Sequence, residues 1–410
     1  MTEEQFKSRT QWAERHVDEF LSRPLVSEFV YRSPQALDGN QREVADFLVT
    51  YGPPGILLSQ KCQEDPTVRT GEKLDSWAHK AAKKGVSQLT GALRTGPGRP
   101  MRCQHRRRGS VDFPTGLPQV AHAVVLIEVL QPVALPGHED FPLDYSGTPI
   151  SYFSLNDFLN VATELRTMPE IIEYLDRRRA LGPDALRTIG EERSLFGFYL
   201  LNESSFAGCV GIPDAKVVLA ARSRHLREIL SRKRESDRLS GLLEYAADQL
   251  ATRLPSYSHG LPPSVVAEFD PPNDRHNYLA MQRALADLRL RERAEMGRAF
   301  DEAITMAGTD HRSFVYRAMH LDSRPDFVYV VGSSRGFSHL TVLERLQALM
   351  HGALAYFGKS RCLAIIDRDG VSFDVGLSRA GYSPSMTDHA VGQELFGKLK
   401  MKSAALSLVP

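Results

Sequence analysis

Two neighbouring segments carry polar side chains whose types and spacing could do chemistry on a phosphate. The first, residues 42–52, reads REVADFLVTYG, and the second, residues 55–63, reads GILLSQKCQ. A Gly-Pro-Pro-Gly turn joins them, which predicts two strands of a hairpin. If the strands pair antiparallel, Asp46 lies near the level of Lys61, since alternate residues of a strand share a face. A carboxylate and a lysine would then meet at one end of a sheet.

Such a pair has two interpretations. An ordinary cross-strand ion pair contributes about 0–1 kcal/mol when it is exposed. Alternatively, the carboxylate binds Mg²⁺, which prefers oxygen ligands and keeps several waters, while the lysine orients or activates the attacking water and stabilises charge on a phosphodiester. Asp46 supplies one metal ligand and Glu43 is a candidate for the second. An acid of the preceding helix, Glu14 or Asp18, is a further candidate.

The elements that must position these residues follow from the spacing of apolar side chains. Residues 3–22 have helical spacing, and residues 25–34, 42–52 and 55–63 read as strands. Residues 72–94 carry one apolar stripe of a helix, and residues 121–131 predict a strand that is buried on both faces. The segment between them, residues 95–118, is rich in Gly, Pro and Arg and predicts a loop. The order is therefore helix, three strands, helix, strand.

This order, together with the wording REVADFLV and GILLSQKCQ, resembles the core of the restriction-endonuclease-like superfamily, the PD-(D/E)xK nucleases. The wording is similar to the branch of nuclease-related (NERD-like) domains, and the resemblance covers roughly the N-terminal third of the chain. It implies an α-β-β-β-α-β core in which Asp46 binds Mg²⁺, with Mn²⁺ as an alternative, and Lys61 assists catalysis. The acid or amide that the family places two residues before the lysine falls on Ser59.

Serine at this position departs from the family pattern. It is a poor metal ligand, although its hydroxyl can hold a metal-bound water. Gln60 could take over if a β-bulge turned its side chain onto the active face, and Gln63 already lies on the face of the lysine. These alternatives stay open. The expected catalytic residues are Asp46, Lys61, Ser59 and Gln60, and the expected metal ligands are Asp46 and Glu43.

A local excess of positive charge follows the hairpin. From Ser76 to Val111 there are nine lysines and arginines and no Asp or Glu, in a chain whose net charge is only +1. Such a run is typical of a surface that follows a phosphate backbone; the alternative is a solvated surface or pairing with acids elsewhere in the fold. The expected nucleic-acid-binding residues are Lys80, Lys84 and Gln88 on the helix and Arg99, Arg102, Arg106, Arg107 and Arg108 in the loop.

The remainder of the chain predicts further domains. Helical patterns dominate residues 154–180, 220–253 and 276–307, with helix starts at Ser154 and Pro169. A strand at 325–334, a helix at 339–358 and a hairpin turning at Asp369-Gly370 follow. We therefore expect a mixed α/β protein with a nuclease-like core at residues 1–135, a mainly helical region at 150–310 and an α+β region at 311–410.

Composition limits the class of protein. The contents of hydrophobic (42%) and charged (25%) residues are ordinary for a globular protein. The four cysteines form no CxxC pair, which favours reduced thiols. The sequence has neither a run of about 18 apolar residues nor a signal-peptide pattern at its start. We therefore expect a cytoplasmic protein without a membrane span.

These features favour a metal-dependent nuclease that acts on DNA, with RNA as an alternative substrate. Some members of the superfamily serve in bacterial defence against phage, so the resemblance implies that context as an expectation. The alternative is a catalytically degraded nuclease-fold protein that binds nucleic acid. A third interpretation is an interaction subunit of a larger complex or a homo-oligomer. Ser59 is the main support for a degraded site.

Overall fold

The computed structural model describes residues 16–37, 43–50, 55–62, 69–129, 133, 141–253, 274–309, 314–378 and 381–397. The chain divides into two compact units, Met1–Ser231 and Arg232–Pro410, and each contains one of two sheets. The fold is mixed α/β, which confirms the predicted class. The predicted domain limits at residues 135, 150 and 310 do not coincide with the division after residue 231.

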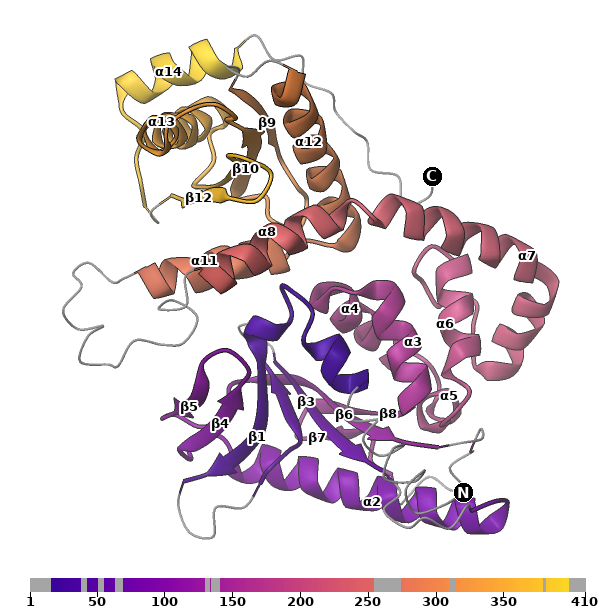
Figure 1. Ribbon diagram of the computed structural model, residues 1–410. Helices are drawn as coiled ribbons and strands as arrows, with labels where there is room; N and C mark the ends of the chain where they lie inside the picture. The colour runs from indigo at the N-terminus through magenta and orange to yellow at the C-terminus, as the bar shows by residue number, and fades with distance from the viewer. Residues whose placement is uncertain are drawn as a thin grey trace. The chain divides into compact units, whose positions relative to one another are not determined.

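The first unit is built on an eight-stranded mixed sheet with the strand order β5-β4-β1-β2-β3-β6-β8-β7 (Figure 1). The strands are β1 (Val30–Ala36), β2 (Phe47–Val49), β3 (Gly55–Lys61), β4 (Met101–His105), β5 (Gly109–Phe113), β6 (Val120–Ile127), β7 (Asp144–Tyr145) and β8 (Thr148–Ser154). Strands β1, β2 and β3 pair antiparallel, whereas β3, β6 and β8 run parallel. The carboxyl ends of β3 and β6 therefore lie at the same edge of the sheet.

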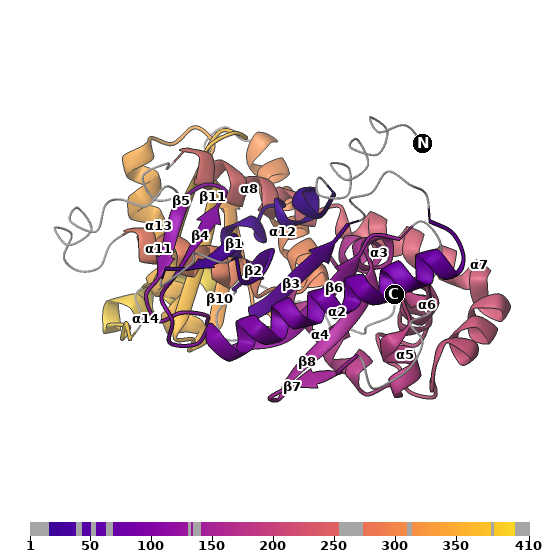
Figure 2. The same cartoon turned by 90° about the horizontal axis from the view of Figure 1, so that it is seen from below.

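Helix α2, Glu72–Thr95, covers one face of this sheet (Figure 2). Its predicted apolar stripe is confirmed, since Ala78, Ala82 and Leu89 are completely buried in the core between helix and sheet. Gly85 lets the helix approach closely, because a Cβ atom there would lie 2.7 Å from Val125 Cγ1 of β6. This close packing brings the polar residues that flank the stripe of α2 near the side chains of β3.

Helices of the same unit cover the opposite face. Neighbouring residues of β8 point to opposite sides: Tyr152 lies in the core under α2, and the Phe153 ring meets the Phe158 ring of α3 at 5.7 Å. Phe20, in the helical residues 16–21, also packs edge-on against Phe158. The helices that follow β8 are α3 (Leu155–Leu165), α4 (Met168–Arg179), α5 (Pro183–Arg187), α6 (Glu192–Leu201) and α7 (Ile212–Asp237).

The predicted helix starts at Ser154 and Pro169 are confirmed. Ser154 Oγ accepts a hydrogen bond from Asp157 N (3.1 Å) and donates one to Asp157 Oδ2 (2.7 Å). Pro169 lies in the first turn of α4, where a missing N–H costs nothing. Local capping chemistry therefore fixes where both helices begin.

Several predicted elements differ in the structure. The loop predicted for residues 95–118 instead contains the hairpin of β4 and β5. Met101, Cys103 and His105 are buried in alternation with exposed residues, a period of two that the Gly, Pro and Arg content obscured. The strands predicted at 25–34 and 42–52 are shorter, because β1 begins only after a 3₁₀-helix at Ser27–Phe29 and β2 spans three residues.

The second unit contains a four-stranded sheet in the order β12-β11-β10-β9. Its elements are α8 (Ser240–Arg253), α11 (Asp274–Ala286), α12 (Leu290–Thr309), β9 (Val315–Met319), β10 (Phe327–Ser333), α13 (His339–Phe357), β11 (Arg361–Asp367), β12 (Phe373–Leu377) and α14 (Met386–Phe396). The predicted turn at Asp369-Gly370 is confirmed: Gly370 has a φ of 85°, and Asp369 Oδ1 accepts hydrogen bonds from the next backbone amides.

Candidate active site at the carboxyl edge of β3

Asp46 and Lys61 meet on the face of the sheet that α2 covers. Pairing of Phe47 with Leu58 sets the register of β2 and β3, and Asp46 N donates to Leu58 O (3.2 Å). Lys61 Nζ lies 3.3 Å from Asp46 Oδ2, and the two side chains are 13% and 27% exposed. The predicted meeting is therefore confirmed, while the catalytic roles of the two residues stay predictions.

The backbone of β3 holds the carboxylate in place. Gln60 N donates a 2.6 Å hydrogen bond to Asp46 Oδ2, the same oxygen that contacts the lysine. The Gln60 side chain instead donates from Nε2 to Cys62 Sγ (3.3 Å). Pairing of β3 with β6 runs without a shift from Ile56 to Lys61, so the bulge proposed to turn Gln60 onto the active face is absent.

Gln88 of α2 joins the site from above the sheet. Its Oε1 accepts hydrogen bonds from Lys61 Nζ (2.7 Å) and Ser59 Oγ (2.8 Å). Because an ammonium group can only donate, the atom that faces it must be the amide oxygen and not the amide nitrogen. Of the three helix residues predicted at this sheet end, Gln88 reaches the site, whereas Lys80 and Lys84 are exposed.

Ser59 is completely buried, and its hydroxyl is committed to Gln88. The position where the resembled family has an acid or amide thus holds a serine that is linked to an amide of the helix. Sequence reasoning placed Gln88 in a nucleic-acid surface and missed this link. The helical spacing of Gln88 from the buried stripe was the available signal, because it places the residue beside the face that packs on β3.

The proposed second carboxylate is less well placed. Glu43 is exposed and forms an isolated backbone bridge with Gln35 of β1. Asp18 pairs with Arg32, while Glu14 and Gln63 lie outside the described residues. Within the part of the chain that the structure describes, no three His, Cys, Asp or Glu side chains gather as a metal-binding group. Asp46 is therefore the one described carboxylate in contact with Lys61.

The arginines of the predicted basic loop belong to a folded hairpin. Arg102 donates two hydrogen bonds to Asp112 (2.7 and 3.0 Å), and this pairing lowers the pKa of the Asp112 carboxyl. Arg107 Nη1 bonds Glu28 Oε1 (2.8 Å), and the buried Arg108 bonds Glu28 O. Arg106 is exposed and Arg99 is half-buried. The prediction of a mobile loop is wrong, and nucleic-acid binding by these residues stays a prediction.

His105 lies at the centre of the contacts that hold this hairpin. Its Nδ1 accepts hydrogen bonds from the backbone amides of Arg107 and Arg108 (both 3.1 Å), so the ring proton is on Nε2, which faces Glu28 O (3.2 Å). Burial and then the charge of Arg108 lower the pKa of His105 to about 3. This neutral, buried imidazole was not foreseen from the sequence.

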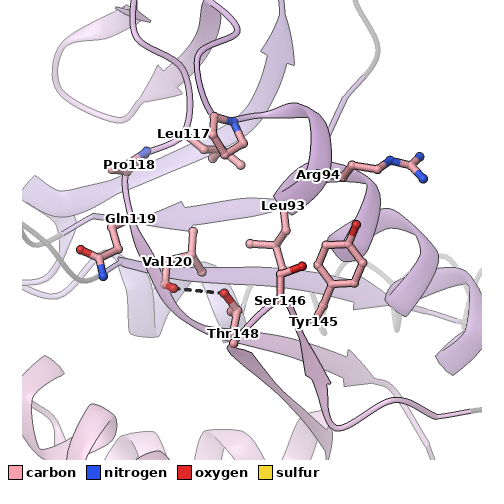
Figure 3. Close-up of a pocket in the computed structure, with 11 residues that line it drawn as sticks. Leu93, Arg94, Leu117, Pro118, Gln119, Val120, Tyr145, Ser146 and Thr148 are labelled. Carbon is pink, nitrogen blue, oxygen red and sulfur yellow. Dashed lines mark hydrogen bonds between the residues drawn. The ribbon is translucent and has the colours of Figure 1, made fainter.

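A cavity of about 640 Å³ opens at the other end of the same strands (Figure 3). Arg94, Tyr145 and Thr148 line it, and Thr148 Oγ1 donates to Val120 O (3.5 Å). Val120 pairs with Gly55, the first residue of β3, whereas Lys61 is the last. The cavity is therefore separate from the Asp46–Lys61 pair, and the chemistry of the side chains favours the latter as the candidate active site.

The chain matches no protein-family model, no curated protein and no solved structure. The resemblance to PD-(D/E)xK nucleases thus rests on its own residues. In the described residues, no helix combines the length and the apolar composition that a membrane crossing requires.

Proposed function

We propose that the protein is a metal-dependent nuclease that hydrolyses phosphodiester bonds of DNA, with RNA as the alternative substrate. The observation that carries the proposal is the 3.3 Å contact between Lys61 Nζ and Asp46 Oδ2 at the end of β3. Both groups are mostly shielded from solvent, and Gln88 fixes the ammonium group from the helix. A lysine held this firmly differs from a surface lysine that moves among rotamers.

The donor atoms around Asp46 are compatible with one magnesium ligand. Both of its contacts in the described part of the chain go to Oδ2, which leaves Oδ1 for a metal ion. Mg²⁺ commonly uses one or two carboxylates and completes its shell with waters and substrate phosphates. Asp46 would hold the ion, with Glu43 as the candidate second ligand. A bound ion would supply positive charge to the phosphate and lower the pKa of a water.

Lys61 would act on the phosphate directly. Hydrolysis forms a bond between a water oxygen and phosphorus and breaks one phosphorus–oxygen bond, so negative charge grows on the phosphate oxygens. An ammonium group in a site that excludes much of the water stabilises this charge more than it would in bulk solution. Gln88 and Asp46 would keep Nζ in position for this contact.

One observation favours a second candidate function. Ser59 is buried and bonded to Gln88, and Asp46 is the one described carboxylate at the lysine. A site with a single acid could have lost cleavage and kept binding. The alternative is therefore a nuclease-fold protein that binds nucleic acid without cutting it, alone or in a larger complex.

Plasmid cleavage in Mg²⁺ or Mn²⁺ tests the proposal. Removing either charged group of the pair, in D46N or K61M, should lower the rate by at least about 10²-fold, the usual effect of losing one electrostatic contact to a transition state. D144N and K359M, which change exposed residues outside the site, should keep the wild-type rate. Full cleavage by both D46N and K61M would refute the assignment. Absent cleavage with salt-sensitive DNA binding in the wild type would favour the alternative.

A further inference from the structure

Helix α7 carries a concentration of positive charge that the candidate active site does not use. Residues 215–234 contain seven lysines and arginines and one acid, Glu228, in a chain of net charge +1. The helix is largely exposed, and the Arg224 side chain is 90% accessible to solvent. The single acid pairs with Arg224 at 3.4 Å, so most of the cationic charge is not neutralised within the stretch.

The packing of α7 determines which of its sides faces solvent. Leu219 and Leu226 lie against Gly197 of α6, where an added Cβ would be 2.8 Å and 3.3 Å from their methyl groups. Both views show α7 beside α6 (Figure 2). The apolar side of the helix is therefore used within the first unit. Of its apolar residues, Val217 is strongly exposed, and it precedes the arginines and forms no stripe among them.

The arginines are arranged along the exposed side. The helix departs from helical geometry at Arg222, and beyond it each residue turns by about 100°. Arg224, Arg227 and Arg234 then fall within roughly 80° of one another around the helix. Arg227 and Arg234 are two turns apart, or about 10 Å along the axis. The helix itself fixes this spacing.

We propose that α7 is a second nucleic-acid-binding surface that holds a phosphate backbone through Arg224, Arg227 and Arg234. A row of cations along one helix matches a linear polyanion, in which phosphates recur at short intervals, better than it matches a single acidic side chain. An interfacial membrane helix would need a free apolar side, which α7 has placed on α6. The proposal goes beyond the nuclease assignment, because its residues lie outside the Asp46–Lys61 site.

A binding titration without divalent metal tests this surface separately from cleavage. The fluorescence anisotropy of a labelled 20-base-pair DNA duplex is measured in EDTA between 50 and 200 mM salt. The triple variant R224Q/R227Q/R234Q should bind more weakly, and the slope of log K against log salt should fall by about 3, since each phosphate contact contributes about 0.9. The control R179Q/R283Q/R298Q removes three exposed arginines of other helices and should leave the slope at its wild-type value.

The outcomes separate the two proposals. D46N should lose cleavage and keep both the affinity and the salt slope. A wild-type protein that cuts no DNA, but whose binding depends on the three α7 arginines, would refute the nuclease proposal and support the α7 surface. An unchanged slope in the α7 variant, an equal loss in the control, or no duplex binding by the wild type would overturn the α7 proposal. So would binding to phosphatidylserine vesicles in place of DNA.

Discussion

The buried imidazole of His105 makes the first unit sensitive to acid. In the folded protein its pKa is lowered from 6.5 to about 3, first by burial and next by the charge of Arg108. Protonation at Nδ1 would remove the acceptor for the backbone amides of Arg107 and Arg108 and place a cation beside two guanidinium groups. The unfolded chain therefore binds the proton first, and stability is lost as the pH falls from 6.5 towards 3.

The size of the effect follows from the two pKa values. At pH 5 the unfolded histidine is almost fully protonated and the folded one is neutral, so the free energy of unfolding falls by about 2 kcal/mol relative to pH 8. His105 is only 3% exposed, so solvent screening does not reduce this figure appreciably. A His105→Asn variant keeps a side-chain carbonyl as an acceptor and does not titrate. It should lack this part of the pH dependence.

Chemical denaturation followed by tryptophan fluorescence measures the effect in the correct unit, since both tryptophans, Trp12 and Trp77, belong to Met1–Ser231. The free energy of unfolding is determined at pH 8 and pH 5 for the wild type and the variant. Carboxylates that titrate in both proteins cancel in the difference. A difference between the proteins that does not change with pH, or an NMR titration in which His105 is protonated at pH 5, would refute the reasoning.

Three further changes test other parts of the first unit by the same fluorescence assay. Glu192→Gln breaks the two bonds that it accepts from the buried Arg178 (2.7 and 2.8 Å), and should cost about 3–5 kcal/mol; a loss below 1 kcal/mol would contradict this. Gly85→Ala forces a methyl group against the stiff Val125 side chain and should destabilise by about 1 kcal/mol, since overpacking outweighs the gain in helix propensity; a more stable variant would show that the strand yields. Gln88→Leu leaves a buried hydroxyl and an ammonium group without their shared acceptor. It should cost about 1–3 kcal/mol, and wild-type stability would mean that these donors find other partners.

The sequence alone predicted the features that depend on short-range geometry. Asp46 and Lys61 are joined by one tight turn, and the two-residue period of strands decides which side chains share a face. The stripe of α2 was readable because its spacing is a property of the helix. The cap at Ser154 and the turn at Asp369-Gly370 involve residues at most three apart.

The tertiary structure decided the features that depend on distant segments. Gln88 is 27 residues from Lys61, and their contact depends on how α2 rotates and how closely Gly85 lets it approach the sheet. Glu28 and Arg107 are 79 residues apart, so no local pattern linked them or converted the basic segment into a hairpin. Local periodicity fixes the direction of a side chain relative to its own element, and only the packing of elements determines which groups meet there.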